Sequence, residues 1–266
     1  MKIYDILNIH GPAIYMKTAV RYILLITAAA AAVSCGPTIA ERKEKSVVHY
    51  RLGVVHLNER KFPEALKELT EAVAAYPEDP SYHNALGLAY FARAMNKEGA
   101  AHMLEAVRLD PKFSEAHANL SAVYIAEGRW DSAIAEAKAA LDNIFYRTPE
   151  IASYNMGRAY FSKGDYKAAL EAFKKAIEAN ANYPDAHYNL GQAYDKLNNW
   201  KGAVEAYERA VRITPDYIEA HYGLGLAYIK EKNMAAARKS FEKVIGLAPE
   251  SDMARSSRDY INLLSK

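Results

Sequence analysis

The sequence predicts an all-α fold, a solenoid of six helix-turn-helix repeats closed by a C-terminal capping helix. Similar residues recur with a period of about 34 positions after Ser46, which indicates a repeated structural unit. Ala, Leu, Glu and Lys are abundant and favour helices, whereas the 266 residues include only 13 Gly and 10 Pro. With 51% hydrophobic and 25% charged residues, the composition is that of a folded chain and not of a disordered one.

The first segment, residues 1–34, reads as an upstream extension followed by a secretory signal. A basic pair, Lys17 and Arg21, precedes an apolar run that ends at Val33. This run is shorter than the roughly 20 residues that a membrane-spanning helix needs, so we expect cleavage and not a permanent span. Met16 is the expected true start.

The single cysteine, Cys35, directly follows this run. Residues 32–35 read AVSC and resemble a bacterial lipobox, in which the cysteine is lipid-modified and becomes the first residue of the mature protein. The alternative is an ordinary signal with a chance cysteine. Several acyl chains on one residue anchor a protein stably, which a single chain does not. By resemblance to sorting rules in bacteria with two membranes, Gly36 implies the outer membrane, and residues 35–45 are expected to be the lipidated Cys and a polar tether.

The repeats are expected to occupy residues 46–251, each with a first helix that carries a small residue near its middle. An apolar residue precedes the small one, and an aromatic ring or His follows three positions later. The pairs are Leu52/Gly53, Leu86/Gly87, Leu120/Ser121, Met156/Gly157, Leu190/Gly191 and Leu224/Gly225. The rings are His56, Tyr90, Tyr124, Tyr160, Tyr194 and Tyr228.

The second helix of each repeat carries another small residue, which lets the two helices approach closely. These residues are Ala65, Gly99, Ala133, Ala169, Ala203 and Ala237. Short polar turns such as Gly128-Arg129 connect the two helices, and a Pro often ends the second one. Because Gly99 replaces an Ala, we expect that helix to be the least stable and Gly99→Ala to be stabilising.

This pattern resembles the tetratricopeptide repeat. Six units match it, namely residues 46–79, 80–113, 114–149, 150–183, 184–217 and 218–251. The resemblance implies a stack of helical hairpins whose first helices line a concave groove. Residues 252–266 carry apolar residues at helical spacing, and we expect them to form the helix that caps the last repeat.

Catalytic and metal chemistry find no basis in the sequence. Neighbouring helices lie about 8–10 Å apart, whereas metal ligands lie about 2 Å from the ion. We therefore interpret a row of histidines at the fourth repeat position as packing rings and not as a metal ladder. No Ser-His-Asp, paired-carboxylate or Gly-rich phosphate motif occurs. We expect no enzyme activity, cofactor, metal or small-molecule substrate. The near balance of 34 basic and 32 acidic residues gives no reason to expect nucleic acid. The histidines are His49, His83, His117, His187 and His221.

The resemblance places the partner-binding residues on the groove side of the first helices. Aromatic and aliphatic side chains there bury a large area at little entropic cost, which suits recognition of a protein. The alternative is that several tyrosines only pack between helices. The expected contacts are Tyr50, Leu57, Leu88, Phe91, Ile125, Tyr154, Phe161, Tyr188 and Tyr222.

A lipobox followed by six repeats, with an elongated third unit that runs into residues 149–157, resembles the type IV pilus biogenesis lipoproteins, the pilotins. The resemblance implies a lipid-anchored protein on the periplasmic face of the outer membrane. It also implies that the groove binds a pilus secretin subunit and assists its localisation and multimer assembly. The alternative is a lipoprotein adaptor that scaffolds peptidoglycan enzymes or another envelope complex. In both cases the partner is a protein, and the lipid on Cys35 makes the membrane contact.

Overall fold

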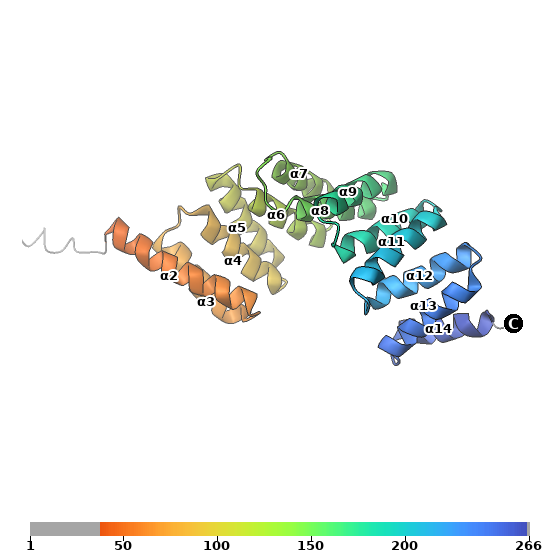
Figure 1. Cartoon of the computed structure of the whole chain (residues 1–266). Coiled ribbons are helices and arrows are strands. Elements are labelled where there is room, and N and C mark those ends of the chain that lie inside the picture. The colour runs from red at the N-terminus through yellow and green to blue at the C-terminus, as the bar shows by residue number, and fades with distance from the viewer. Residues whose placement is uncertain (1–37, 265–266) are drawn as a thin grey trace, which may run out of the picture.

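The computed structural model describes residues 38–264, an array of paired helices that runs from α2 at one end to α14 at the other (Figure 1). The first helices of the six repeats are α2 (Ile39–Asn58), α4 (Pro80–Ala92), α6 (Ser114–Ala126), α8 (Pro149–Lys163), α10 (Pro184–Lys196) and α12 (Ile218–Lys230). The second helices are α3 (Phe62–Ala75), α5 (Asn96–Leu109), α7 (Trp130–Leu141), α9 (Tyr166–Ala179), α11 (Trp200–Ile213) and α13 (Met234–Leu247). The capping helix is α14 (Asp252–Leu263). The described part of the chain contains no strand, and the predicted all-α solenoid is confirmed.

Each helix contacts only its own repeat and adjacent repeats. The two helices of a hairpin pack together, and each second helix packs on the next first helix. First helices of successive repeats also touch, whereas second helices of successive repeats do not touch to a comparable extent. The array therefore curves with its first helices on the inner side, and we call the surface that they form the inner surface.

The small residues of the hairpins are buried, and each glycine of the first helix accommodates a large side chain of the second. A Cβ at Gly157 would lie 2.5 Å from the ring of Phe173, and one at Gly191 would lie 2.6 Å from the ring of Tyr207. The third repeat reverses both choices, with Ser121 at the glycine position and a small Ala at the position of the ring. The two helices thus share a fixed volume between them.

Gly99 is not the weak point that helix propensity predicts. A Cβ there would lie 3.0 Å from the carbonyl oxygen of Gly87 and 3.3 Å from the backbone nitrogen of Phe91. Both atoms belong to the backbone of α4, so neither can move aside as a flexible side chain can. The structure therefore reverses the expectation, and we expect Gly99→Ala to separate α4 from α5 and to destabilise the chain.

Helix α2 begins before the first repeat unit. Residues 39–45, expected to be part of a polar tether, form its first turns. The Oγ1 atom of Thr38 accepts a hydrogen bond from the backbone N–H of Glu41 at 3.2 Å, and the Glu41 carboxylate accepts one from the N–H of Thr38 at 2.7 Å. This capping box starts the helix. The predicted leader, Met16 and Cys35 lie outside the described residues.

The two ends of the array differ. Helix α14 packs on α13, and the ring of Tyr260 stacks on that of Phe241 with centroids 5.2 Å apart, as expected of a cap. No helix of the described chain covers the outer side of α2, so Leu52 is 45% exposed, whereas Leu86 at the same position of the next repeat is 2% exposed. None of the helices between residues 38 and 264 is long and apolar enough to span a bilayer.

Candidate peptide-binding groove

An apolar cavity of about 600 Å³ lies on the inner surface of the first two repeats. It is bounded by α2 and α4, by the start of α3 and by the segment that enters α6. We call it the N-terminal cavity. Its apolar lining is Tyr50, Val54, Leu57, Phe62, Leu88 and Phe113.

Small and polar residues of α4 leave this space open. Ala85 lines the cavity and is almost fully buried. The amide oxygen of Asn84 accepts a hydrogen bond from the amide of Asn119 at 3.0 Å, which directs it toward α6. The ring of Tyr50 is held against that of Tyr82, with centroids 4.8 Å apart. Burial raises the pKa of Tyr50, so its hydroxyl stays neutral and can donate a hydrogen bond to a ligand.

In repeats 4 and 5 tyrosines of the protein cover part of the same surface, and a smaller cavity of about 380 Å³ remains beside Asp195, Leu226 and Ile229. Tyr154 and Tyr188 occupy the position that Asn84 has in α4, and each is covered by a tyrosine that precedes the next first helix. The centroids of Tyr154 and Tyr183 are 4.9 Å apart, and those of Tyr188 and Tyr217 are 5.1 Å apart. We call these four rings the C-terminal tyrosine row.

Polar contacts fix this row. The hydroxyl of Tyr217 donates a hydrogen bond to Asp185 at 2.8 Å, and the hydroxyl of Tyr154 accepts one from Asn189 at 3.1 Å. Burial is the main cause that raises the pKa of all four tyrosines, so they remain neutral at physiological pH. The row is a rigid part of the protein more than an open binding surface.

The nine predicted groove contacts therefore fall into different environments. Tyr50, Leu57 and Leu88 line the N-terminal cavity. Tyr154 and Tyr188 belong to the C-terminal tyrosine row.

The other four predicted contacts pack against side chains of their own array. Phe91 is half-buried against the core cluster, and Phe161 lies edge-on to Tyr166 with centroids 5.2 Å apart. Tyr222 lies edge-on to Phe241 at 5.9 Å. Ile125 is 7% exposed inside the core and offers almost no surface to a partner, so we remove it from the groove contacts.

Two aromatic residues of the cavity, Phe62 and Phe113, are not among the predicted contacts because neither lies within a first helix. Phe62 begins α3, and Phe113 precedes α6. Their positions in the sequence could have indicated both contacts. Phe62 follows the turn after the first helix of repeat 1, and Phe113 directly precedes the first helix of repeat 3.

The recurring histidines tie each repeat to the loop before it. The Nε2 atoms of His83 and His117 lie 3.1 Å from the carbonyl oxygens of Pro77 and Pro111. Those of His187 and His221 lie 3.0 Å from the carbonyl oxygens of Ala181 and Pro215. Because a carbonyl only accepts, each Nε2 carries the proton. Residues 38–264 contain no group of three His, Cys, Asp or Glu placed to hold a metal ion.

Comparison with known families identifies the repeats. A family model described as tetratricopeptide repeat matches residues 50–98, 94–144 and 154–218, and a second model of the same description matches residues 218–251. A curated relative, the TPR repeat-containing thioredoxin TTL4 of Arabidopsis thaliana, is 32% identical over 93 residues. That match covers 35% of this chain and 13% of the relative, so the chain spans a small part of that protein's length.

Three solved structures share the fold. PilF of Pseudomonas aeruginosa is 16% identical with a TM-score of 0.73, and the match covers 82% of this chain and 98% of PilF. PilW, described as a widely conserved type IV pilus biogenesis factor, is 16% identical with a TM-score of 0.74 and coverages of 79% and 97%. YrrB, described as a TPR protein with an unusual peptide-binding site, is 19% identical with a TM-score of 0.57 and coverages of 72% and 97%.

These structural likenesses concern the fold, whereas the family models match most of the sequence. Tetratricopeptide arrays are typically non-catalytic scaffolds that bind proteins. The chain belongs to the tetratricopeptide repeat family.

Proposed function

We propose that this chain holds an apolar segment of a partner protein in the N-terminal cavity while lipid on Cys35 keeps the complex at the periplasmic face of the outer membrane. The proposed partner is a type IV pilus secretin subunit, whose localisation and multimer assembly the chain assists. The main observation that supports this proposal is the N-terminal cavity. The shared fold with PilF and PilW supports the choice of partner.

The size and lining of the cavity suit a short apolar segment. Binding pockets commonly enclose about 300–1,000 Å³, and this one encloses about 600 Å³. Full burial of one Leu or Phe side chain contributes about 1.5–3 kcal/mol. Around the apolar lining, Asn58, Ser81 and Asn84 provide polar groups that can bond the backbone of the bound segment.

The cavity can be tested without disturbing the core. Ala92 is exposed and lines the cavity, so Ala92→Glu places a charge beside the bound segment at little cost in stability. Ala126, exposed at the same position of the third repeat, is the matched control. We expect Ala92→Glu to weaken binding to the purified secretin subunit at least tenfold and to reduce secretin multimers in cells, and Ala126→Glu to change neither.

Normal secretin multimers with a stable Ala92→Glu protein would exclude secretin assembly through this cavity. If the same variant instead lost a peptidoglycan enzyme from its complexes, the adaptor function would replace the secretin function.

The anchor is tested separately with Cys35→Ser. We expect the variant to keep its melting temperature and to leave the outer-membrane fraction, while the unmodified chain incorporates labelled palmitate. A variant that stayed in that fraction, with no label on the unmodified chain, would contradict lipidation.

A further inference from the structure

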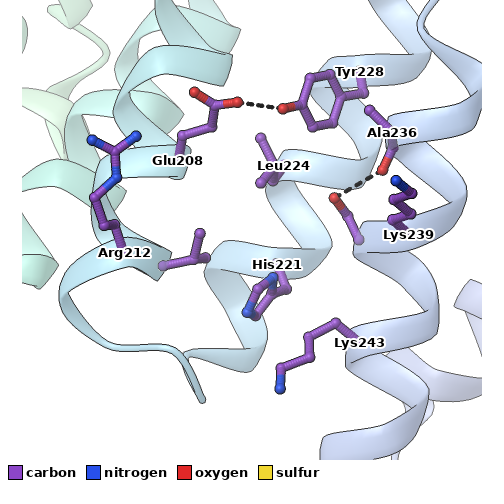
Figure 2. Close-up of a pocket in the computed structure, with 10 residues that line it drawn as sticks. Glu208, Arg212, His221, Leu224, Tyr228, Ala236, Lys239 and Lys243 are labelled. Atoms are coloured by element: carbon purple, nitrogen blue, oxygen red, sulfur yellow. Dashed lines mark hydrogen bonds between the residues drawn. The ribbon is translucent and has the colours of Figure 1, made fainter.

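A second cavity, of about 390 Å³, lies between the second helices of repeats 5 and 6 and shares no residue with the N-terminal cavity (Figure 2). Helices α11 and α13 flank it, and α12 lies between them. Val211, Leu224 and Ala236 contribute its apolar lining. We call it the outer pocket.

Basic side chains surround the outer pocket. Arg212 comes from α11, and Lys239 and Lys243 come from α13 (Figure 2). None of the three forms an ion pair or hydrogen bond with the described part of the chain. The one carboxylate of the pocket, Glu208, accepts a hydrogen bond from the hydroxyl of Tyr228. The pocket therefore has an excess of positive charge that the protein leaves unpaired.

Two earlier repeats show a contact that the histidine of this pocket lacks. His221 occupies the fourth position of its repeat, as His49 and His117 do. The Nδ1 atom of His49 lies 2.7 Å from the carboxylate of Glu68, and that of His117 lies 2.6 Å from the carboxylate of Glu136. Both glutamates occupy the twenty-third position of their repeats. Two of the five histidines thus have a carboxylate beside Nδ1, whereas the Nδ1 atom of His83 lies 3.2 Å from a nitrogen of His102.

Repeat 6 lacks that carboxylate. Its twenty-third residue is Ser240, whose hydroxyl donates a hydrogen bond to the carbonyl of Ala236 at 3.1 Å and makes none to the histidine. The Nε2 atom of His221 donates to the carbonyl of Pro215 at 3.0 Å, which leaves Nδ1 without a partner in residues 38–264. The space of the missing glutamate side chain is part of the outer pocket.

We propose that the outer pocket binds a glutamate or aspartate side chain of an acidic peptide segment, with its carboxylate beside His221 where Glu68 and Glu136 lie in their own repeats. Because Nε2 of His221 already carries a proton and a carboxylate only accepts, the ring takes up a second proton from solvent at Nδ1 when the carboxylate binds. Arg212, Lys239 and Lys243 neutralise the carboxylate and its acidic neighbours. The apolar lining contacts the methylene groups, which inorganic anions lack. This site is separate from the N-terminal cavity, so the proposal does not depend on the secretin as partner.

Repeat 5 provides an internal control for the charge. His187 also faces a small residue, Ala206, at the twenty-third position. Two glutamates, Glu178 and Glu205, stand there at the positions that Arg212 and Lys239 hold in the outer pocket. The same backbone with acidic side chains should reject an acidic peptide.

The test measures binding of a fluorescein-labelled hexaglutamate peptide to the full chain by fluorescence anisotropy. We expect Lys243→Glu to weaken binding at least tenfold, and Arg209→Glu, the same change at the same position of repeat 5, to have less than a twofold effect. The ring nitrogen resonances of His221 should shift on titration, and those of His187 should not. Equal loss in the two charge variants would show that only net charge matters and would overturn the proposal.

A second variant restores the missing side chain. Ser240→Glu should place a carboxylate beside His221 from within the chain and abolish peptide binding, whereas Ser240→Ala should retain it. Melting curves confirm that each variant is folded. Full binding by a folded Ser240→Glu variant would overturn the proposal, and so would inorganic phosphate that competed as tightly as the peptide, because the pocket would then be a phosphate site.

Discussion

The N-terminal cavity and the C-terminal tyrosine row are built from the same repeat positions, yet one is open and the other is closed. Asp79, just before α4, accepts a hydrogen bond from the backbone N–H of Ser81 at 2.9 Å. Its side chain therefore caps helix α4 and does not cover the inner surface. Tyr183 and Tyr217, at the equivalent position before α10 and α12, make no such cap and lie over Tyr154 and Tyr188.

The comparison teaches that the residue entering each first helix helps decide whether the inner surface is available to a ligand. A short capping residue leaves the neighbouring space empty. Tyr183 and Tyr217 fill that space and forgo the cap, which costs about 0.5–2 kcal/mol at a helix start. Ring packing and burial offset this cost in the second half of the array. Phe113, the aromatic residue before α6, instead forms part of the lining of the N-terminal cavity.

The largest expected effect concerns the interlocked pairs that stiffen the second half. Phe173 is fully buried, so Phe173→Ala should cost about 3–5 kcal/mol in the free energy of unfolding. Gly157→Ser alone should also destabilise, because its Cβ would lie 2.5 Å from the Phe173 ring. Combined, the two changes reproduce the Ser and Ala of repeat 3, and the double variant should lose less than the sum of both losses. Urea unfolding of the four proteins gives this coupling. Strictly additive losses would contradict the shared volume.

A smaller effect is expected for the hydroxyl that fixes the tyrosine row. Tyr217→Phe removes the hydrogen bond to Asp185 and should cost about 1–2 kcal/mol, because a bond to a carboxylate is lost. Tyr183→Phe is the matched control, since no hydrogen bond of the Tyr183 hydroxyl is seen in the described chain. Thermal unfolding of the two variants should differ by several degrees. Equal melting temperatures would show that ring packing alone holds the row.

The turns inside the hairpins allow the same residue exchange to be tested in the first and the second half of the array. Each turn has one residue with positive φ at the fifteenth repeat position, which is Gly164 at +83° in repeat 4 but Ala94 at +58° in repeat 2. Left-handed backbone costs a non-glycine residue about 1–2 kcal/mol. Ala94→Gly should therefore stabilise by up to about 1 kcal/mol, and Gly164→Ala should destabilise by a similar amount. Nothing lies within 4 Å of a Cβ at Gly164, so its loss would come from the backbone alone. Denaturation midpoints that moved in the same direction would contradict this account.

The smallest expected effect is in the pH dependence. The carboxylate of Glu136 is the main cause that raises the pKa of His117, whereas burial lowers the pKa of His187. The His117–Glu136 pair therefore makes its full contribution to the free energy of unfolding below the ordinary histidine pKa of about 6.5. This contribution is lost as the pH rises through the raised pKa of His117. Glu136→Gln should cost under about 1 kcal/mol, and more at pH 5.5 than at pH 8.5. His187→Gln should show the opposite trend, because it removes a group that opposes folding at low pH. Unfolding at the two pH values checks both signs.

Spacing in the sequence predicts most of the fold. The recurrence of Gly and Ala locates both helices of every hairpin, because a close helix contact has a strict size limit. The start of α2 could also have been predicted, since Thr38 and Glu41 form a capping-box pattern. The predicted boundary at residue 46 did not take this pattern into account. Gly99 shows the limit of this approach. Helix propensity treats that glycine as a defect, and only the distance between α4 and α5 shows that a methyl group there would press on the backbone of α4.

The candidate site was less predictable than the fold. Tyr50, Leu57 and Leu88 could be assigned to the inner surface because repeat position fixes the face of a helix. Whether a residue on that face is free depends on neighbours about a repeat away, as with Tyr154 beneath Tyr183. Ile125 shares its repeat position with Leu57, yet it belongs to a core cluster, whereas Leu57 lines the N-terminal cavity.

The contacts between adjacent repeats also bear on the order in which the protein acquires its structure. No contact joins the first repeat to the last, so folding closes only short loops, which favours fast folding. The residues that line the N-terminal cavity end at Glu115, within the first turn of α6. A secreted chain that crosses the membrane N-terminus first presents these residues before those of the tyrosine row, so we expect the cavity to be assembled first. A partner segment could then bind while the rest of the array is still being added.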